Sequence, residues 1–145
     1  MSLIYGTTSH RGVFSWRKMA RYLKEQEEEF ELLLFSPLLR SKQTAEIVKD
    51  VLGIKKSTEV IELVPDAPPE ALAKWLQNSV PQVTKVILVG HEPQMSSFAS
   101  WCLSGERESF IDLKKSGAIG LEIESFSEIS GGNAQLNWVI QPKMV

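Results

Sequence analysis

The sequence predicts an α/β fold with a mostly parallel central sheet and helices on both of its faces. Two observations lead to this class. Short uninterrupted apolar runs alternate along the chain with longer segments whose apolar residues recur at helical spacing. The last third changes to alternating apolar and polar residues around a Gly-Gly turn, which is typical of an antiparallel hairpin. The repeated strand–helix order favours parallel strands joined by crossover helices.

The first half of the chain is predicted to hold two helices and two strands, after a start that the pattern leaves unclear. Uninterrupted apolar residues indicate a strand buried on both faces, and helical spacing indicates a helix with one buried face. The expected elements are a helix over 16–28 with Ser15 as N-cap, a strand over 32–35, a helix over 39–52 ended by Gly53, and a short strand over 60–63.

The second half is predicted to complete the sheet. Pro68 and Pro69 suit the start of a third helix, because proline is tolerated in a first turn. The remaining elements are a buried strand over 85–89, a helix over 95–103 that ends near Gly105, and a hairpin with strands over 119–124 and 136–140.

Length and composition fit one domain, expected to span residues 1–145. The net charge is −2, and no basic stripe interleaved with aromatic residues suggests a nucleic-acid surface. The apolar runs are far shorter than the roughly 20 residues that span a bilayer. The single cysteine, Cys102, allows no internal disulfide and agrees with a reducing compartment. We therefore expect a cytoplasmic protein without nucleic-acid or membrane partners, and its oligomeric state stays open.

Arg40 follows the first buried strand and stands in the first turn of the helix over 39–52. In open α/β sheets, ligands bind at the carboxyl ends of parallel strands, where loops and helix N-termini converge. A cation in a first turn opposes the helix dipole by about 0.3 to 1 kcal/mol, and a bound anion would reverse that sign. The planar guanidinium can hold two phosphate oxygens at once. Position alone leaves open whether Arg40 binds an anion or pairs with an acidic neighbour at the surface.

His91 follows the second buried strand, in the segment Gly90-His91-Glu92-Pro93. Gly90 permits close approach of the backbone, and Pro93 suits the start of the next helix. Here the imidazole could hydrogen-bond a phosphoryl oxygen, while Glu92 could orient it or cap the helix. A single histidine at a strand end is equally compatible with a structural role. Arg40 and His91 at one edge of the same sheet together favour a phosphate pocket.

Three segments resemble motifs of a known family: Ser-Pro-Leu-Leu-Arg over 36–40, Gln-Thr-Ala-Glu over 43–46 and Val-Gly-His-Glu-Pro over 89–93. They are similar to the histidine phosphatase superfamily, and most similar to its SixA-type phosphohistidine phosphatases. The resemblance covers about residue 16 to the C-terminus. It implies a three-layer phosphoglycerate mutase-like fold and a reaction that needs no metal or other cofactor.

The resemblance also implies a mechanism. A histidine attacks the phosphoryl group and forms a phosphohistidine intermediate, which water then hydrolyses. Two arginines and a second histidine neutralise the phosphoryl oxygens. Arg40 matches one of these arginines, His91 the second histidine, and Ser36 belongs to the phosphate-binding segment. The general acid stays open, and the candidates by loop position are Asp66, Glu70 and Glu92.

The nucleophile departs from the family pattern, which places Arg-His-Gly or Arg-His-Ala directly after the first strand. This chain has His10-Arg11-Gly12, separated from the only strand candidate, over 3–5, by Gly6 and three polar residues. Three interpretations stay open. His10 and Arg11 act as nucleophile and phosphate clamp in changed order. Alternatively, an N-terminus truncated or atypical over about 1–15 lacks the first strand and its motif, or the nucleophile is lost and a phosphate pocket remains.

The sequence thus predicts a phosphohistidine phosphatase that acts on a phosphorylated histidine of a signalling or phosphotransfer protein. A small phosphorylated substrate is the second choice, because no long insertion suggests a lid that would enclose one. A catalytically impaired module that binds phosphate or a phosphoprotein is the alternative function. A structural α/β domain without a ligand is the third hypothesis, and phosphate, vanadate or tungstate should then give no thermal shift.

Overall fold

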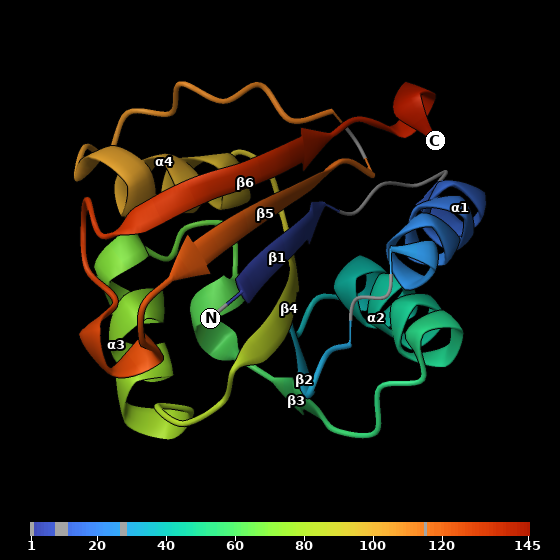
Figure 1. Cartoon of the computed structure of the whole chain (residues 1–145), viewed down its shortest axis with the longest axis horizontal. Helices are drawn as coiled ribbons and strands as arrows, with labels where there is room; N and C mark the ends of the chain where they lie inside the picture. The colour runs from blue at the N-terminus through green and yellow to red at the C-terminus, as the bar shows by residue number, and fades with distance from the viewer. Residues whose placement is uncertain (1, 8–11, 27–28, 115) are drawn as a thin grey trace.

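The computed structural model describes residues 2–7, 12–26, 29–114 and 116–145, and for residues 2–7, 12–15 and 142 it describes the backbone alone. Strands and helices alternate along most of the chain (Figure 1). The elements are β1 (Ser2–Thr7), α1 (Gly12–Glu25), β2 (Leu32–Phe35), α2 (Leu39–Leu52), β3 (Ser57–Glu59), the 3-10 turn η1 (Ile61–Leu63), α3 (Pro69–Ser79), β4 (Lys85–Gly90), α4 (Gln94–Ser104), β5 (Ala118–Ile123), the 3-10 turn η2 (Phe126–Glu128), β6 (Ala134–Ile140) and the 3-10 turn η3 (Pro142–Met144).

The strands form one six-stranded sheet in the order β3-β2-β4-β1-β5-β6. The pairs β3–β2, β2–β4 and β4–β1 are parallel, whereas β5 runs antiparallel to both β1 and β6. This arrangement confirms the predicted α/β class with a mostly parallel sheet and a C-terminal antiparallel hairpin. We call the edge where β1 to β4 end the carboxyl edge, and the edge where they begin the amino edge.

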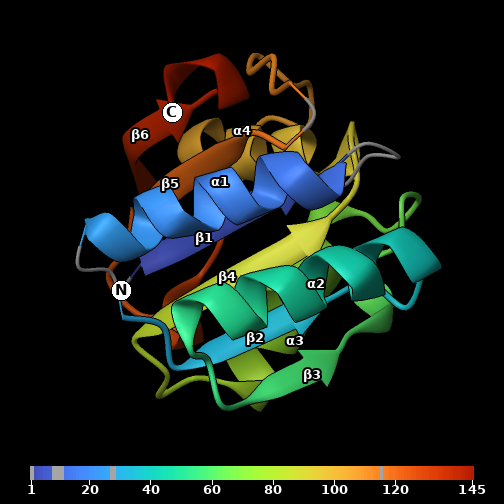
Figure 2. The ribbon, with the colours of Figure 1, turned by 90° about the vertical axis from the view of Figure 1, so that its right-hand side faces the viewer.

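Helices cover both faces of the sheet because successive side chains of a strand point to opposite faces. Leu33 and Ile87 belong to the apolar cluster that packs against α1 and α2, while Leu34 and Leu88 belong to the cluster with α3 and α4. Figure 2 shows α1 and α2 side by side over one face. Each fully buried Leu or Ile stabilises the fold by about 1.5–3 kcal/mol. Among the described residues, no helix has the length and apolar character needed to cross a membrane.

The first helix differs from the prediction at both ends. It begins at Gly12, so that Ser15 lies inside the helix instead of capping it, and it ends at Glu25 instead of about 28. The buried stripe that predicted the helix is confirmed, since Trp16 and Met19 have no exposed surface. Periodicity locates a buried face well, but it carries little information on where the polar ends of a helix stop.

The short strand predicted over 60–63 is wrong. The strand β3 lies earlier in the chain, and Ile61 opens the turn η1. Val60 and Leu63 are buried, at 1% and 0% exposure, while Ile61 between them is 64% exposed. Buried residues three apart fit a 3-10 turn, in which residues i and i+3 share a face, and they do not fit a strand with its period of two.

Candidate active site

Arg40 and His91 follow two strands that lie side by side. In the parallel pair β2–β4, Phe35 stands opposite Val89, and the Ser36 N–H donates to the Val89 carbonyl at 3.1 Å. The chain leaves both strands at the carboxyl edge. The structure therefore places the loop before Arg40 next to the loop that carries His91.

Two buried serine hydroxyls contact the imidazole of His91. Its Nε2 lies 2.9 Å from Oγ of Ser36 and 3.1 Å from Oγ of Ser41. Both serines have 0% exposure, and Oγ of Ser36 also accepts the Leu38 N–H at 3.3 Å. These contacts tie the end of β4 to the start of α2, and they hold the ring of His91 in place.

Arg40 is the second residue of α2, and its side chain is exposed. Leu38, the N-cap residue, makes no side-chain capping bond, and the first turn of the helix holds no acidic residue. The N–H groups of a first turn carry partial positive charge, to which the guanidinium adds a full one. This combination favours an anion, and a phosphoryl group has oxygens for both kinds of donor.

The environment of His91 disfavours a charged ring. Partial burial lowers the pKa of His91 below its ordinary value of 6.5, and the positive charge of Arg40 lowers this pKa further. At neutral pH the imidazole is therefore neutral, with a hydrogen on one ring nitrogen and a lone pair on the other. A phosphoryl dianion beside the ring would act in the opposite direction, because negative charge favours the imidazolium.

Glu92 binds the helix that follows it. Its carboxylate accepts the backbone N–H of Ser96 at 2.8 Å and also the Ser96 hydroxyl. Burial of the carboxyl group against α4 raises the pKa of Glu92, the bonds from Ser96 oppose the rise, and the charge of Asp112 adds to it. Of the two roles that the sequence left open for Glu92, these contacts show the helix cap.

The predicted nucleophile His10 and its neighbour Arg11 lie outside the described residues. The backbone on either side of them is described: β1 ends at Thr7, whose partner in β4 is Gly90, and α1 begins at Gly12. The interpretation that the chain lacks a first strand is wrong, because β1 takes a place in the sheet between β4 and β5. The roles of His10 and Arg11 stay predictions.

Ser41 contacts the predicted site residue His91, and the sequence reasoning missed it. Ser41 lies beside Arg40 in the first turn of the helix, and the pattern that predicts the helix does not distinguish this serine from its neighbours. The buried face of α2 consists of Ser41, Thr44, Ala45 and Val48. A polar residue on such a stripe must find a hydrogen-bond partner, so this spacing could have identified Ser41 as a residue that faces the neighbouring strand.

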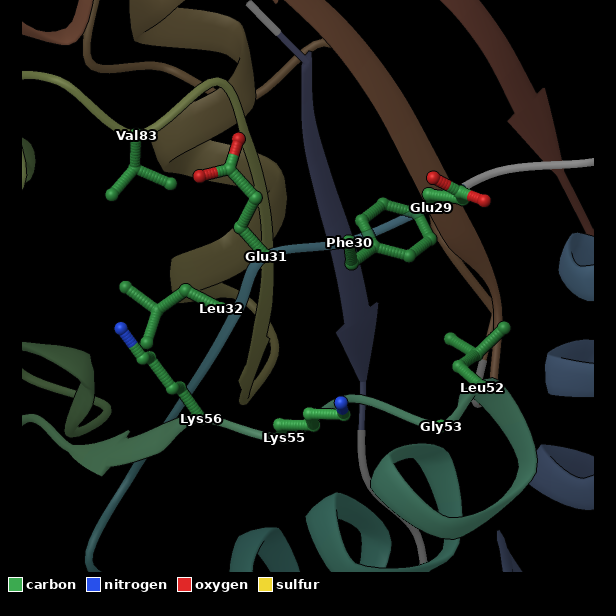
Figure 3. Close-up of a pocket in the computed structure, with 9 residues that line it drawn as sticks. All are labelled: Glu29, Phe30, Glu31, Leu32, Leu52, Gly53, Lys55, Lys56 and Val83. Atoms are coloured by element: carbon green, nitrogen blue, oxygen red, sulfur yellow. The ribbon is translucent and has the colours of Figure 1, made fainter.

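A separate cavity of about 710 Å³ lies at the amino edge, where β2, β3 and β4 begin. Its charged residues are Glu29, Glu31, Lys55 and Lys56, and Figure 3 shows their side chains spread around the cavity. Glu31 accepts the backbone N–H of Thr84 at 3.1 Å and also its hydroxyl. No group of three or more His, Cys, Asp or Glu that could hold a metal occurs within the described part of the chain, at this edge or the other.

Sequence comparison identifies relatives of the chain, although no protein-family model matches it. Over 128 residues the chain is 30% identical to the phosphohistidine phosphatase SixA of Escherichia coli K12, a match that covers 87% of this chain and 75% of the relative. The chain belongs to the histidine phosphatase superfamily. This SixA-like histidine phosphatase is also 33% identical over 114 residues to an uncharacterized protein of Picosynechococcus, covering 77% of this chain and 68% of the relative.

Solved structures share the fold of this histidine phosphatase. The protein histidine phosphatase SixA complexed with tungstate matches it with a TM-score of 0.86 at 23% identity, over 99% of both chains. A putative phosphohistidine phosphatase SixA from Nakamurella multipartitia has a TM-score of 0.82 at 14% identity, over 97% of this chain and 95% of the other. A phosphoglycerate mutase from Plasmodium falciparum reaches 0.69 at 12% identity, over 94% and 88%. The predicted phosphoglycerate mutase-like fold is thereby confirmed.

Proposed function

We propose that this histidine phosphatase, with residues 1–145 acting as one domain, is a phosphohistidine phosphatase. It would remove the phosphoryl group from a phosphorylated histidine of a signalling or phosphotransfer protein. The observation that supports this most is the juxtaposition of Arg40 and His91 at the carboxyl edge, with the ring of His91 held by Ser36. The match to a relative named as a phosphohistidine phosphatase supports the same substrate class.

In the proposed reaction, Arg40 and His91 bind the oxygens of the phosphoryl group, and Ser36 belongs to the same phosphate pocket. Charge redistributes over these oxygens as the phosphoryl group is transferred. Fixed donors in a partly buried site stabilise this charge, and the loss of one such donor lowers kcat by about 10²–10³-fold. The bonds at His91 Nε2 support this role, because they keep the ring in place before the substrate arrives.

We assign the nucleophile to His10 and a second phosphate-binding cation to Arg11. His10 is three residues beyond Thr7, and three extended residues reach at most about 11 Å. Thr7 pairs with Gly90, next to His91. A nitrogen of His10 would bond to phosphorus while the bond from phosphorus to the substrate imidazole breaks and that imidazole takes up a proton. Water would then hydrolyse the phosphohistidine and release phosphate.

Two apolar residues beside Arg40 favour a phosphorylated protein over a small phosphorylated metabolite. Leu38 is 44% and Leu39 69% exposed, directly before the guanidinium in the chain. Exposed apolar side chains next to a binding site are suited to contact with a protein surface. A small phosphorylated substrate would bind the same cations without using these leucines.

Turnover of phosphohistidine together with a trapped phosphoenzyme tests this function. Wild-type protein is expected to release phosphate from a phosphohistidine-containing protein and to carry an acid-labile label in rapid-quench experiments. His10→Gln should lose both the label and turnover, whereas Arg17→Ala, a change of an exposed cation on α1, should keep both. Absence of turnover and label in the wild type would contradict the enzymatic function.

The order His-Arg-Gly, in place of the family's Arg-His-Gly, favours a second candidate function. Here the chain binds phosphate or a phosphoprotein but does not turn it over. Binding of tungstate that depends on Arg40, without release of phosphate from any phosphohistidine substrate, would support this candidate and contradict the first.

A further inference from the structure

We propose that Ser41 is a positioning residue for His91: its buried hydroxyl holds Nε2 of the ring so that the imidazole stays oriented for a phosphoryl group. The inference rests on the proposed function of the site. Ser41 lies outside the motif segments that suggested the family. In this inference the first turn of α2 has two roles: Arg40 binds the phosphoryl group and Ser41 orients His91.

The burial of Ser41 is the first support. A hydroxyl removed from water destabilises the fold unless a hydrogen bond compensates it. Ser41 has 0% exposure, and its Oγ lies 3.1 Å from Nε2 of His91. An alanine would fill nearly the same space without that requirement. The hydroxyl is therefore explained by the histidine that it contacts.

The direction of the two serine contacts is the second support. The ring torsion of a histidine is broad, so that a single contact leaves the ring free to turn. Ser36 reaches Nε2 from the loop after β2, and Ser41 reaches the same atom from the helix α2. Nε2 offers a single site, one hydrogen or one lone pair, which the two hydroxyls share, and a shared contact from two different elements restricts this rotation more than a single contact does.

The exposure gradient at the site shows that Ser41 acts through His91. Arg40 is exposed and His91 is half-buried, whereas Ser41 is fully buried. A substrate at the surface can touch the first two but not the third. Removal of the Ser41 hydroxyl should therefore affect phosphate binding and turnover while His91 is present, and should lose most of its effect once His91 is removed.

A double-mutant cycle with matched controls tests this dependence. The variants are Ser41→Ala, His91→Gln and their combination. The control is Ser100→Ala in α4, because Ser100 is also fully buried and accepts a backbone N–H, that of Phe110 at 3.2 Å, away from His91. Ser41→Thr retains the hydroxyl. Three readouts are measured: the ¹⁵N signal of the His91 ring, the affinity for tungstate, and kcat/KM for a phosphohistidine substrate.

The expected result is a change of the His91 ring signal in Ser41→Ala, together with roughly fivefold to tenfold weaker tungstate binding and lower kcat/KM, the loss of about one net hydrogen bond. Ser100→Ala should leave the ring signal and both constants as in the wild type, and Ser41→Thr should restore them. In the His91→Gln background, Ser41→Ala should change either constant by less than twofold. The chain has two histidines, so His91→Gln also assigns the ring signal.

An unchanged His91 signal in Ser41→Ala would overturn the inference, as would an equal loss of affinity with and without His91. A wild type that neither binds tungstate nor turns over substrate would overturn the proposed function instead, and the ring signal would still decide whether Ser41 holds His91. If Ser41→Ala lowers the folded fraction, Ser41→Cys provides the same comparison, because its thiol is larger than the hydroxyl and leaves no cavity, but it is only a weak hydrogen-bonding group.

Discussion

The two edges of the sheet differ in how their polar groups are arranged. At the amino edge, a cavity of about 710 Å³ is bordered by two carboxylates and two ammonium groups that lie apart from one another (Figure 3). At the carboxyl edge, the hydroxyls of Ser36 and Ser41 meet at one atom of His91, whose titration also responds to Arg40. The amino edge has the large cavity, whereas at the carboxyl edge several polar side chains meet at one residue.

This difference follows from the topology of a parallel sheet. Helix N-termini follow the carboxyl ends of the strands, and they bring N–H groups and partial positive charge to that edge. The C-termini of the helices lie at the other edge, where lysines such as Lys55 and Lys56 face partial negative charge. Binding of an anion should therefore depend on the first edge and be insensitive to the second.

Removal of Arg40 is the change expected to have the largest effect on this comparison. Hydrogen bonds to charged groups contribute about 1.5–3 kcal/mol, so Arg40→Ala should weaken tungstate binding by about 10- to 100-fold. Lys56→Ala, which removes an exposed cation at the amino edge, should leave the affinity within twofold. Isothermal titration of the two variants gives the comparison. Equal losses in both would indicate a general charge effect and contradict a specific site at Arg40.

The sequence was sufficient to predict that the loops carrying Arg40 and His91 meet, because both loops follow buried strands. The apolar runs over 32–35 and 85–89 predict two parallel strands, and residues that follow such strands meet at one edge. Arg40 and His91 are brought together in this way. The helix stop at Gly53 was equally predictable, because its φ of +67° lies in the left-handed region that glycine adopts without strain.

The rest depended on contacts that no local pattern shows. Ser41 is significant because of a histidine fifty residues away, a long-range contact that helical periodicity does not reveal. A turn at Ile61 stands where a strand was predicted, because the spacing of the buried residues decides between the two. Val60 and Leu63 are buried and Ile61 is exposed, although all three are apolar. The strand β1 is longer than the apolar pattern predicts, because it contains a glycine and has Ser2 and Thr7 at its ends. Its place in the sheet comes from pairing on both sides, with β4 and β5.

His91 at the carboxyl edge should make the stability of the protein depend on pH, an effect smaller than that of Arg40→Ala on tungstate binding. The folded state holds the pKa of His91 below its ordinary value of 6.5, so the unfolded chain binds more protons around and below that pH. Stability should therefore fall as the pH decreases from 7 through about 6.5, and the fall should level off once the folded-state pKa is passed. The free energy of unfolding, measured by urea titration at several pH values between 7.5 and 5, gives this dependence.

His91→Gln should remove part of this slope, because glutamine does not titrate. Glutamine also fills part of the space of the ring, which limits the loss of packing. A slope that is the same in the variant and in the wild type would show that His91 is not perturbed by burial and by Arg40.

The smallest effect is expected at the amino edge. The hydrogen bonds from the side chain and backbone of Thr84 lower the pKa of Glu31, with a further contribution from the charge of Lys56. Stability from this group is present above the ordinary pKa of 4.5 and is lost as the pH falls through the folded-state value. Since Glu31 is exposed, Glu31→Gln should shift Tm by less than about 3 °C at pH 7. A larger shift, or any change in tungstate affinity, would contradict the proposed division between the edges.

The most direct test of that division is an NMR titration of the wild-type protein with tungstate, in which signals from both edges are followed together. We expect the His91 ring and the Arg40 side chain to shift and to saturate with one common affinity, while the signals of Lys55, Lys56 and Val83 stay in place. Saturable shifts at the amino-edge residues with an unchanged His91 would contradict the assignment of the phosphate pocket to the carboxyl edge.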